Sequence, residues 1–201
     1  MRVSQVVGCQ KLSCSDMKHE YYLVPDIDIN PERVFMVMIS EASPTNPSDY
    51  YYAAGQPLFQ QTTVQAFQDA GINITSIKDI LDLGVYLTTA VKCGKTNYSI
   101  NSNTIEACST LLEKELALFP NVKAYMLMGD IAIKAINLIA KRTAQPRVIP
   151  AGSTYKIRGQ PYFFKGRRVF PSYLQAGPSF FIEKSKRKMI ADDIRVAMEL
   201  L

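Results

Sequence analysis

Four cysteines and a single histidine limit the chemistry that this chain can perform. The cysteines form two pairs, Cys9 with Cys14 and Cys93 with Cys108. Four thiolates can close a structural zinc site or hold an iron–sulfur cluster. The spacing leaves both open, and it also leaves open four unrelated small apolar side chains. Neither pair has the short spacing of zinc ribbons, which weakens the zinc interpretation.

Two further residues could take part in acid–base chemistry. His19 is the only imidazole available to a nucleophilic triad, and in KHEYYLVP it fits a solvated loop better. Glu41 ends an apolar run that is typical of a buried strand. A buried acid is costly unless it has partners, so we expect Glu41 to be functional.

Composition predicts a single globular domain over residues 1–201. Hydrophobic residues make up 47% of the chain and charged residues 20%. We expect no membrane span and no signal peptide, and therefore a cytoplasmic protein, which we take to be a monomer. The net charge of +5 suits a polyanionic partner such as nucleic acid.

The elements that must position these residues follow from apolar runs and periodicity. Short, nearly continuous apolar runs predict strands buried on both faces, and amphipathic stretches between them predict helices. The strands are expected over 34–42, 85–93, 124–129 and 168–173, and the helices over 58–71, 104–119, 130–142 and from about 183 to the end.

Strands that alternate with helices predict an α/β fold with right-handed crossovers. We expect a three-layer α/β/α sandwich with a central parallel sheet of about four strands. Ligands of such sheets bind beyond the carboxyl ends of the strands. The loops after Ala42, Cys93, Gly129 and Tyr173 are therefore the candidate site.

Five segments in order resemble the motifs of the uracil-DNA glycosylase superfamily, most closely its iron–sulfur family 4 branch. They are SEASP at 40–44, GQPLF at 55–59, YLTTAVKC at 86–93, MGDIA at 128–132 and PSYLQ at 171–175. The resemblance implies a glycosylase that flips a base out of DNA and hydrolyses its N-glycosidic bond. It also implies that the four cysteines hold a structural 4Fe-4S cluster, with zinc as the alternative. The first pair is spaced as C-x4-C, where the family has C-x2-C.

The resemblance also assigns roles at the base. Glu41 matches the acidic residue that orients or activates water, and Phe59 matches the aromatic that stacks on the base. Phe59 could equally be a core residue at a helix start. Thr89 stands where the family has the asparagine that reads uracil, with Ser43 as a further base-binding candidate. Leu174 replaces a histidine that stabilises the leaving base, so it offers no hydrogen bond there.

Basic residues near the last motif predict contacts with DNA phosphates. The alternative is a solvated helix face. Leu174 or Phe180 could fill the space of the flipped base. The DNA-binding candidates are Ser172, Leu174, Arg167, Arg168, Lys184, Lys186, Arg187 and Lys188.

Three functions remain open at the level of sequence. The first is a DNA glycosylase, acting on uracil or another base through Glu41, Asp49, Asn46 or the tyrosines at 50–52. The second is a catalytically silent nucleic-acid-binding relative, in which the tyrosines stack on bases or cover the loop. The third is a relative that acts on a nucleoside or another small molecule.

Overall fold

A mixed six-stranded sheet forms the centre of the computed structural model, which describes residues 1–10 and 14–201. Its strand order is β1-β3-β2-β4-β6-β5. The four central strands are parallel, and the short strands at both edges are antiparallel. The predicted parallel sheet is thus confirmed, with two edge strands added. The strands are β1 (Met17–Lys18), β2 (Met36–Ser43), β3 (Val85–Lys95), β4 (Ala124–Met128), β5 (Tyr162–Phe164) and β6 (Arg167–Ser172).

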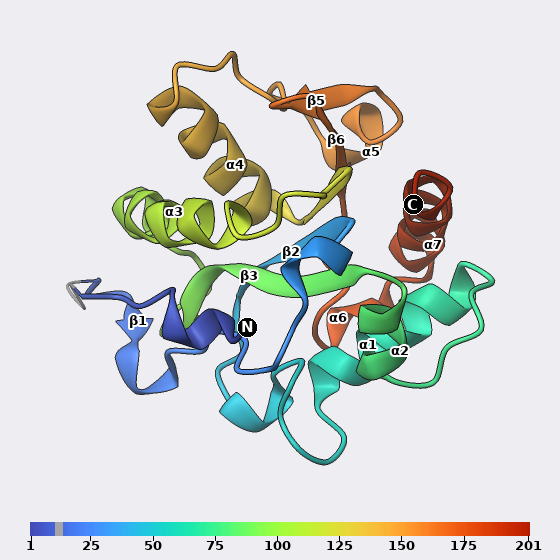
Figure 1. Ribbon diagram of the computed structural model, residues 1–201, viewed down its shortest axis with the longest axis horizontal. Coiled ribbons are helices and arrows are strands. Elements are labelled where there is room, and N and C mark those ends of the chain that lie inside the picture. Colours follow the sequence, from blue (N-terminus) through green and yellow to red (C-terminus); the bar gives the residue numbers. More distant parts are fainter. Residues whose placement is uncertain (11–13) are drawn as a thin grey trace.

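Helices cover both faces of the sheet, so the predicted three layers are confirmed (Figure 1). Helices α3 and α4 lie on one face, and α1, α2 and α7 lie on the other. Within the described residues, no helix is long and apolar enough to cross a membrane. The helices are α1 (Leu58–Asp69), α2 (Ile77–Asp82), α3 (Ser102–Leu116), α4 (Asp130–Arg142), α5 (Thr154–Ile157), α6 (Ser179–Ile182) and α7 (Lys184–Met198), with 3-10 turns η1 (Val3–Gln5), η2 (His19–Tyr21), η3 (Pro31–Arg33) and η4 (Pro47–Asp49).

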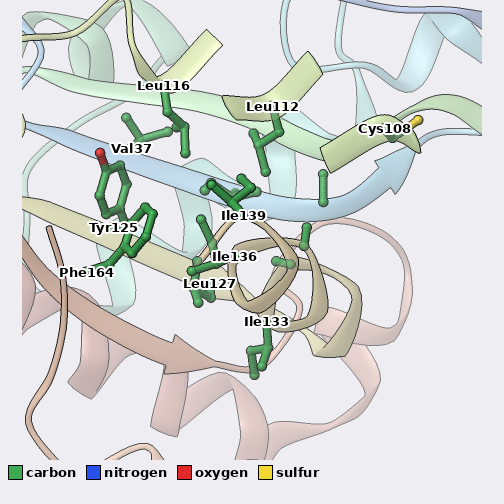
Figure 2. Close-up of a cluster of buried hydrophobic side chains, with 14 of the residues drawn as sticks. Val37, Cys108, Leu112, Leu116, Tyr125, Leu127, Ile133, Ile136, Ile139 and Phe164 are labelled. Carbon is green, nitrogen blue, oxygen red and sulfur yellow. The ribbon is translucent and has the colours of Figure 1, made fainter. Parts of the chain in front are cut away.

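Strand β2 shows why the central runs are almost wholly apolar. Val37 and Ile39 pack against the α3 and α4 side, whereas Met36 and Met38 pack against the α1 and α7 side. Side chains alternate between the two faces of a strand, so a strand covered on both faces needs apolar residues at every position. Figure 2 shows the first of these two cores, where Val37 lies among side chains of α3, α4 and β4.

Some helices begin or end where capping residues in the sequence indicate. The φ angle of Gly71 is +84°, and α1 ends just before it, as predicted. Helix α2 begins with a capping box in which Ser76 and Asp79 exchange hydrogen bonds. The prediction missed this short helix. Helix α3 begins at Ser102, two residues before the predicted start at Thr104.

Candidate functional site

Glu41 lies within β2, near the carboxyl edge of the sheet, and its side chain reaches the first turn of α4. Its Oε1 accepts a hydrogen bond of 3.3 Å from the backbone N–H of Ile131. Burial raises the pKa of this carboxyl, against the lowering effect of the Ile131 N–H and of Lys95. The first turn of a helix favours a carboxylate because its N–H groups lack partners within the helix.

Gly129 makes this placement possible. Its φ is +104°, and an added Cβ would lie 2.6 Å from the Glu41 Oε1 atom. Any side chain at this position would therefore be strained and would displace the carboxyl group. The MGDIA motif thus provides both the bend before α4 and the space for Glu41.

The neighbouring side chain, Ser40, points to the opposite face of the sheet and belongs to a fully buried polar cluster. Its Oγ lies 2.5 Å from the hydroxyl of Tyr51 and donates a 3.1 Å hydrogen bond to Oε1 of Gln175. Gln175 Nε2 donates to the Tyr51 hydroxyl at 3.1 Å. The Tyr51 ring packs on Phe59 with centroids 5.3 Å apart. Phe59, the predicted stacking residue, therefore contacts a protein ring.

The other tyrosines of the 50–52 run also have structural contacts. Tyr50 is 4% exposed. Tyr52 donates to the carbonyl of Leu87 at 2.9 Å and accepts from its N–H at 3.2 Å, which covers the outer edge of β3. These contacts favour the interpretation that the tyrosines at 50–52 cover the protein, rather than the interpretation that they stack on bases. Asn46 accepts from the Ser48 N–H and Asp49 from the Leu58 N–H, so both organise the loop.

Thr89, in the middle of β3, lies beside Ser43, the last residue of β2. Their hydroxyl oxygens are 3.4 Å apart, and Ser43 donates a 2.9 Å hydrogen bond to the carbonyl of Lys92. Both side chains are buried, at 0% and 3% exposure. The structure therefore brings the two predicted base-binding hydroxyls together, and places them away from open solvent.

The four cysteines gather around the end of β3. Cys93 is buried within β3, two residues before the strand ends, and Cys108 lies on α3, near the edge of the core in Figure 2. Burial, followed by the charges of Cys108, Cys9 and Cys14, raises the pKa of Cys93 to about 12. Residues 11–13, between the first two cysteines, lie outside the described residues.

This gathering suits a group that neutralises several thiolates. Bare thiolates so close together repel one another, whereas a bound metal group removes that repulsion and deprotonates its ligands. No three His, Cys, Asp or Glu side chains in the described part of the chain converge as a single metal ion requires. Four thiols are the donor type of a sulfur-ligated group, and both its binding and its identity stay a prediction.

The basic residues of α7 lie together, but several are already paired. Arg187 forms an ion pair with Asp69 (Nη2 to Oδ1, 2.7 Å), and Lys186 forms one with Glu183 at 2.5 Å. Lys184 is exposed and lines a groove with Arg187. The residues around this groove, of about 470 Å³, are Asp69, Lys184, Arg187, Lys188, Ala191, Asp192 and Arg195.

The structure does not bring the arginines of β6 to this site. Arg167 and Arg168 begin β6, so they lie at the amino end of the parallel strands, whereas Glu41 lies toward their carboxyl end. The Arg168 guanidinium donates to the carbonyls of Gln160 and Tyr162 and lies 4.6 Å from the centroid of the Phe170 ring. It therefore secures the β5–β6 hairpin rather than facing the predicted DNA surface.

Residues after β6 differ in exposure. Ser172 is fully buried and donates a 2.6 Å hydrogen bond to Asp193, which ties β6 to α7. Leu174 is partly buried. Phe180, a predicted wedge, is 3% exposed, whereas its neighbours Phe181 and Ile182 are 43% and 77% exposed. Phe180 is thus a core residue in this arrangement.

Sequence reasoning missed a buried ion pair beside the cysteines. Lys92 and Glu115 are both 0% exposed, and their charged atoms are 2.5 Å apart. Lys92 also donates to the Thr88 hydroxyl, and Glu115 accepts from the hydroxyls of Thr88 and Tyr86. A lysine inside a strand-like apolar run was the available signal, because a buried lysine needs a charged partner.

Asp16 was also missed, and it holds the N-terminal arm against α3. Its carboxylate accepts from the N–H of Asn101 at 2.7 Å and from the Thr104 hydroxyl at 2.6 Å. Burial alone would raise the pKa of Asp16, but these hydrogen bonds bring the pKa below its usual value. Asp16 therefore caps a helix from a distant segment, which no local pattern reveals.

Asp16→Asn is expected to lower the free energy of unfolding at pH 7 by about 1–3 kcal/mol, because charge-assisted hydrogen bonds are lost. A lowered carboxyl pKa adds stability above the unfolded value, about 3.9, and this stability disappears as the pH falls through the folded value. Urea unfolding from pH 7 to pH 3 should therefore show the difference shrinking in acid. A difference that is constant with pH would contradict this account.

Comparisons with known proteins identify a relative of this chain. A curated relative, the type-5 uracil-DNA glycosylase of Thermus thermophilus, is 32% identical over 97 residues. The match covers 47% of this chain and 41% of that protein, less than half of either. That relative is named type 5, whereas the motifs resemble family 4, so the branch stays a prediction.

Among solved structures, the wild-type UNG crystal structure from Nitratifractor salsuginis matches with a TM-score of 0.42 and 12% identity. The match covers 86% of this chain and 75% of that one. A family model described as the uracil DNA glycosylase superfamily matches residues 31–192. This match spans most of the chain and includes β2, β3, β4 and β6. The chain therefore belongs to the uracil DNA glycosylase superfamily.

Proposed function

We propose that residues 1–201 form one domain that acts as a base-excision DNA glycosylase. The reaction is hydrolysis of the N-glycosidic bond of a base flipped out of DNA. The observation that carries this proposal is Glu41, a carboxyl of raised pKa at the carboxyl edge of the parallel strands. Ligands of such sheets bind at this edge, and a carboxylate of raised pKa is a stronger base than an ordinary carboxylate.

In this proposal Glu41 orients or deprotonates the attacking water. Phe59 provides an aromatic face for the base, and Ser43 and Thr89 provide hydroxyls beside it. Leu174 cannot stabilise the departing base by a hydrogen bond. We therefore expect slow catalysis, or a substrate whose base leaves more readily than uracil.

We propose DNA as the partner, bound by a monomer in the cytoplasm. Lys184 and Lys188 are exposed one helical turn apart on α7 and line the groove that also contains Arg195. Contacts of this kind with phosphates give affinity without sequence preference. Both single-stranded and double-stranded DNA remain candidate substrates.

We further propose that the four cysteines hold a 4Fe-4S cluster of the family 4 kind, with zinc as the alternative. Their sulfurs would ligate the group through Cys9, Cys14, Cys93 and Cys108. When bound, it would supply a structural link between the N-terminal arm, β3 and α3, rather than a redox step.

Cys93→Ser is expected to abolish the brown colour and the iron content of protein purified without oxygen, and to lower its melting temperature. Asp16→Asn is the matched control, because it loosens the same arm without removing a thiol. Iron, sulfide and zinc analyses of both variants make the measurement. A colourless, iron-free wild type prepared in this way would eliminate the cluster, and stoichiometric zinc would support the alternative.

A second function is favoured by the buried cluster around Tyr51. Because a protein ring already packs on Phe59, a silent DNA-binding relative would show this same arrangement. Single-turnover cleavage of duplexes and single strands carrying uracil, hypoxanthine, xanthine or mismatched thymine, with binding measured in parallel, separates the two. Cleavage of any substrate supports the glycosylase, binding alone supports the silent relative, and neither would direct attention to nucleosides.

A further inference from the structure

The hydroxyl of Tyr51 takes part in a closed ring of three hydrogen bonds. The Ser40 hydroxyl donates its one hydrogen to Gln175 Oε1. The short contact between Tyr51 and Ser40, 2.5 Å, therefore requires the tyrosine to donate. Gln175 Nε2 in turn donates to the Tyr51 oxygen at 3.1 Å. Toward Ser40 and Gln175, Tyr51 thus presents one donor and one acceptor from an aromatic ring.

A nucleobase also offers one donor and one acceptor on a flat ring, although on two neighbouring atoms rather than on one oxygen. Uracil and hypoxanthine each carry an N–H beside a carbonyl oxygen on a flat ring, and a carboxamide pairs well with such an edge. Phe59 adds an aromatic wall, since its ring lies 5.3 Å from that of Tyr51. The polar wall is fixed by further contacts of Gln175 Nε2 with Thr63 at 3.4 Å and with the sulfur of Met38 at 3.3 Å.

We propose that Tyr51 occupies the base pocket of this protein, and that a flipped base with an adjacent donor and acceptor displaces it and is read by Gln175 and Ser40. This inference rests on the proposed function and deepens it by naming the residues that read the base. Because Ser40 and Glu41 point to opposite faces of β2, the bound nucleotide would have to reach Glu41 around the carboxyl end of that strand. It gives the chain a carboxamide reader on the loop after β6, in place of the family asparagine that Thr89 replaces. It also explains how a glycosylase can have a filled pocket in the absence of DNA.

The segment that carries Tyr51 is suited to such a movement. It joins β2 to α1 and contains Gly55, whose φ is +88° and whose surroundings leave open space. In the described part of the chain, the buried hydroxyl of Tyr50 finds no hydrogen-bond partner. A buried polar group without a partner is unfavourable, so release of this segment would recover its hydration.

The first test is ligand binding to Tyr51→Ala, followed by calorimetry. The probes are p-cresol, toluene, free uracil and free hypoxanthine. We expect p-cresol to bind more tightly than toluene, and at least one base to bind. Adding Gln175→Leu should weaken base binding at least tenfold and leave toluene unchanged. Binding of p-cresol without any base would overturn the proposal, because the space would then accept only a replacement for the missing tyrosine side chain.

The second test uses the wild type, so it does not depend on a variant that folds. Methionine labelled at its methyl carbon makes Met38 a reporter, because its sulfur contacts Gln175. Titration with free bases, and with DNA that the protein binds or cleaves, should shift the Met38 signal. Cleavage or binding with no Met38 shift from any probe would overturn the inference and keep the proposed function. A Met38 shift with free bases, without DNA binding, would support the pocket and contradict the DNA function.

Discussion

Glu115→Ala is expected to lower the free energy of unfolding by about 3–5 kcal/mol, because it leaves the buried ammonium of Lys92 without a counter-charge. Lys92 is 0% exposed, and its Nζ atom lies 2.5 Å from Glu115. The remaining contacts, with the Thr88 hydroxyl and the Thr89 carbonyl, are neutral. The hydroxyl of Tyr86 would also lose its acceptor. Urea unfolding at pH 7 measures the loss.

The matched control removes both charges. The double variant Lys92→Met with Glu115→Leu leaves no unpaired charge, so it should recover most of the lost stability, as replacement of buried ion pairs by apolar residues often does. The Thr88 and Tyr86 hydroxyls still lose an acceptor, so recovery should be incomplete. If Glu115→Ala unfolds within about 1 kcal/mol of the wild type, the pair is not desolvated as the structure shows.

This pair matters for the candidate site because it joins β3 to α3 beside the cysteines. Lys92 precedes Cys93, and its backbone N–H hydrogen-bonds to Cys108. A loosened β3–α3 contact would therefore alter the spacing of two of the four thiols. The double variant should keep any metal content of the wild type, whereas Glu115→Ala should reduce it.

The sheet could be predicted because burial on both faces leaves a direct mark on the sequence. Runs such as VFMVMIS and VYLTTAVKC are apolar at nearly every position, and both became central strands. The edge strands β1 and β5 have two and three residues, too few to show a period. The sequence signal for the β5–β6 hairpin was the dipeptide Lys165-Gly166. In the structure both residues have positive φ angles, as a tight two-residue turn requires.

The site was predicted less completely, because its contacts join residues far apart in the sequence. The apolar runs predicted that Glu41 and Cys93 lie toward the carboxyl ends of their strands, where the structure has them. They did not reveal that Glu41 contacts α4, or that Gln175 contacts a side chain 124 residues away. Arg168 was assigned to the DNA surface because of its sequence neighbours, although a strand carries its two ends to opposite edges of a sheet.

Glu41→Gln is expected to reduce single-turnover cleavage by about 10²–10⁴-fold while leaving the fold and the DNA affinity unchanged. The amide keeps an oxygen that can accept from the Ile131 N–H, but it cannot take a proton from water. Because burial raises the pKa of Glu41, ionisation disfavours the folded state as the pH rises. The neutral amide should therefore not lower the melting temperature at pH 7.

Comparison of Glu41→Gln with Glu41→Ala separates catalysis from helix capping, because glutamine keeps an oxygen that accepts from the Ile131 N–H, whereas alanine removes both functions. If Glu41 is the base, both variants lose cleavage, and the wild-type rate rises with pH through a pKa above the ordinary carboxyl value, since only the ionised form accepts a proton. If Glu41→Gln retains full activity and Glu41→Ala does not, then Glu41 positions α4 and another group activates the water. Full activity in both variants would remove Glu41 from the mechanism, and the geometry at Gly129 would then be explained by capping alone.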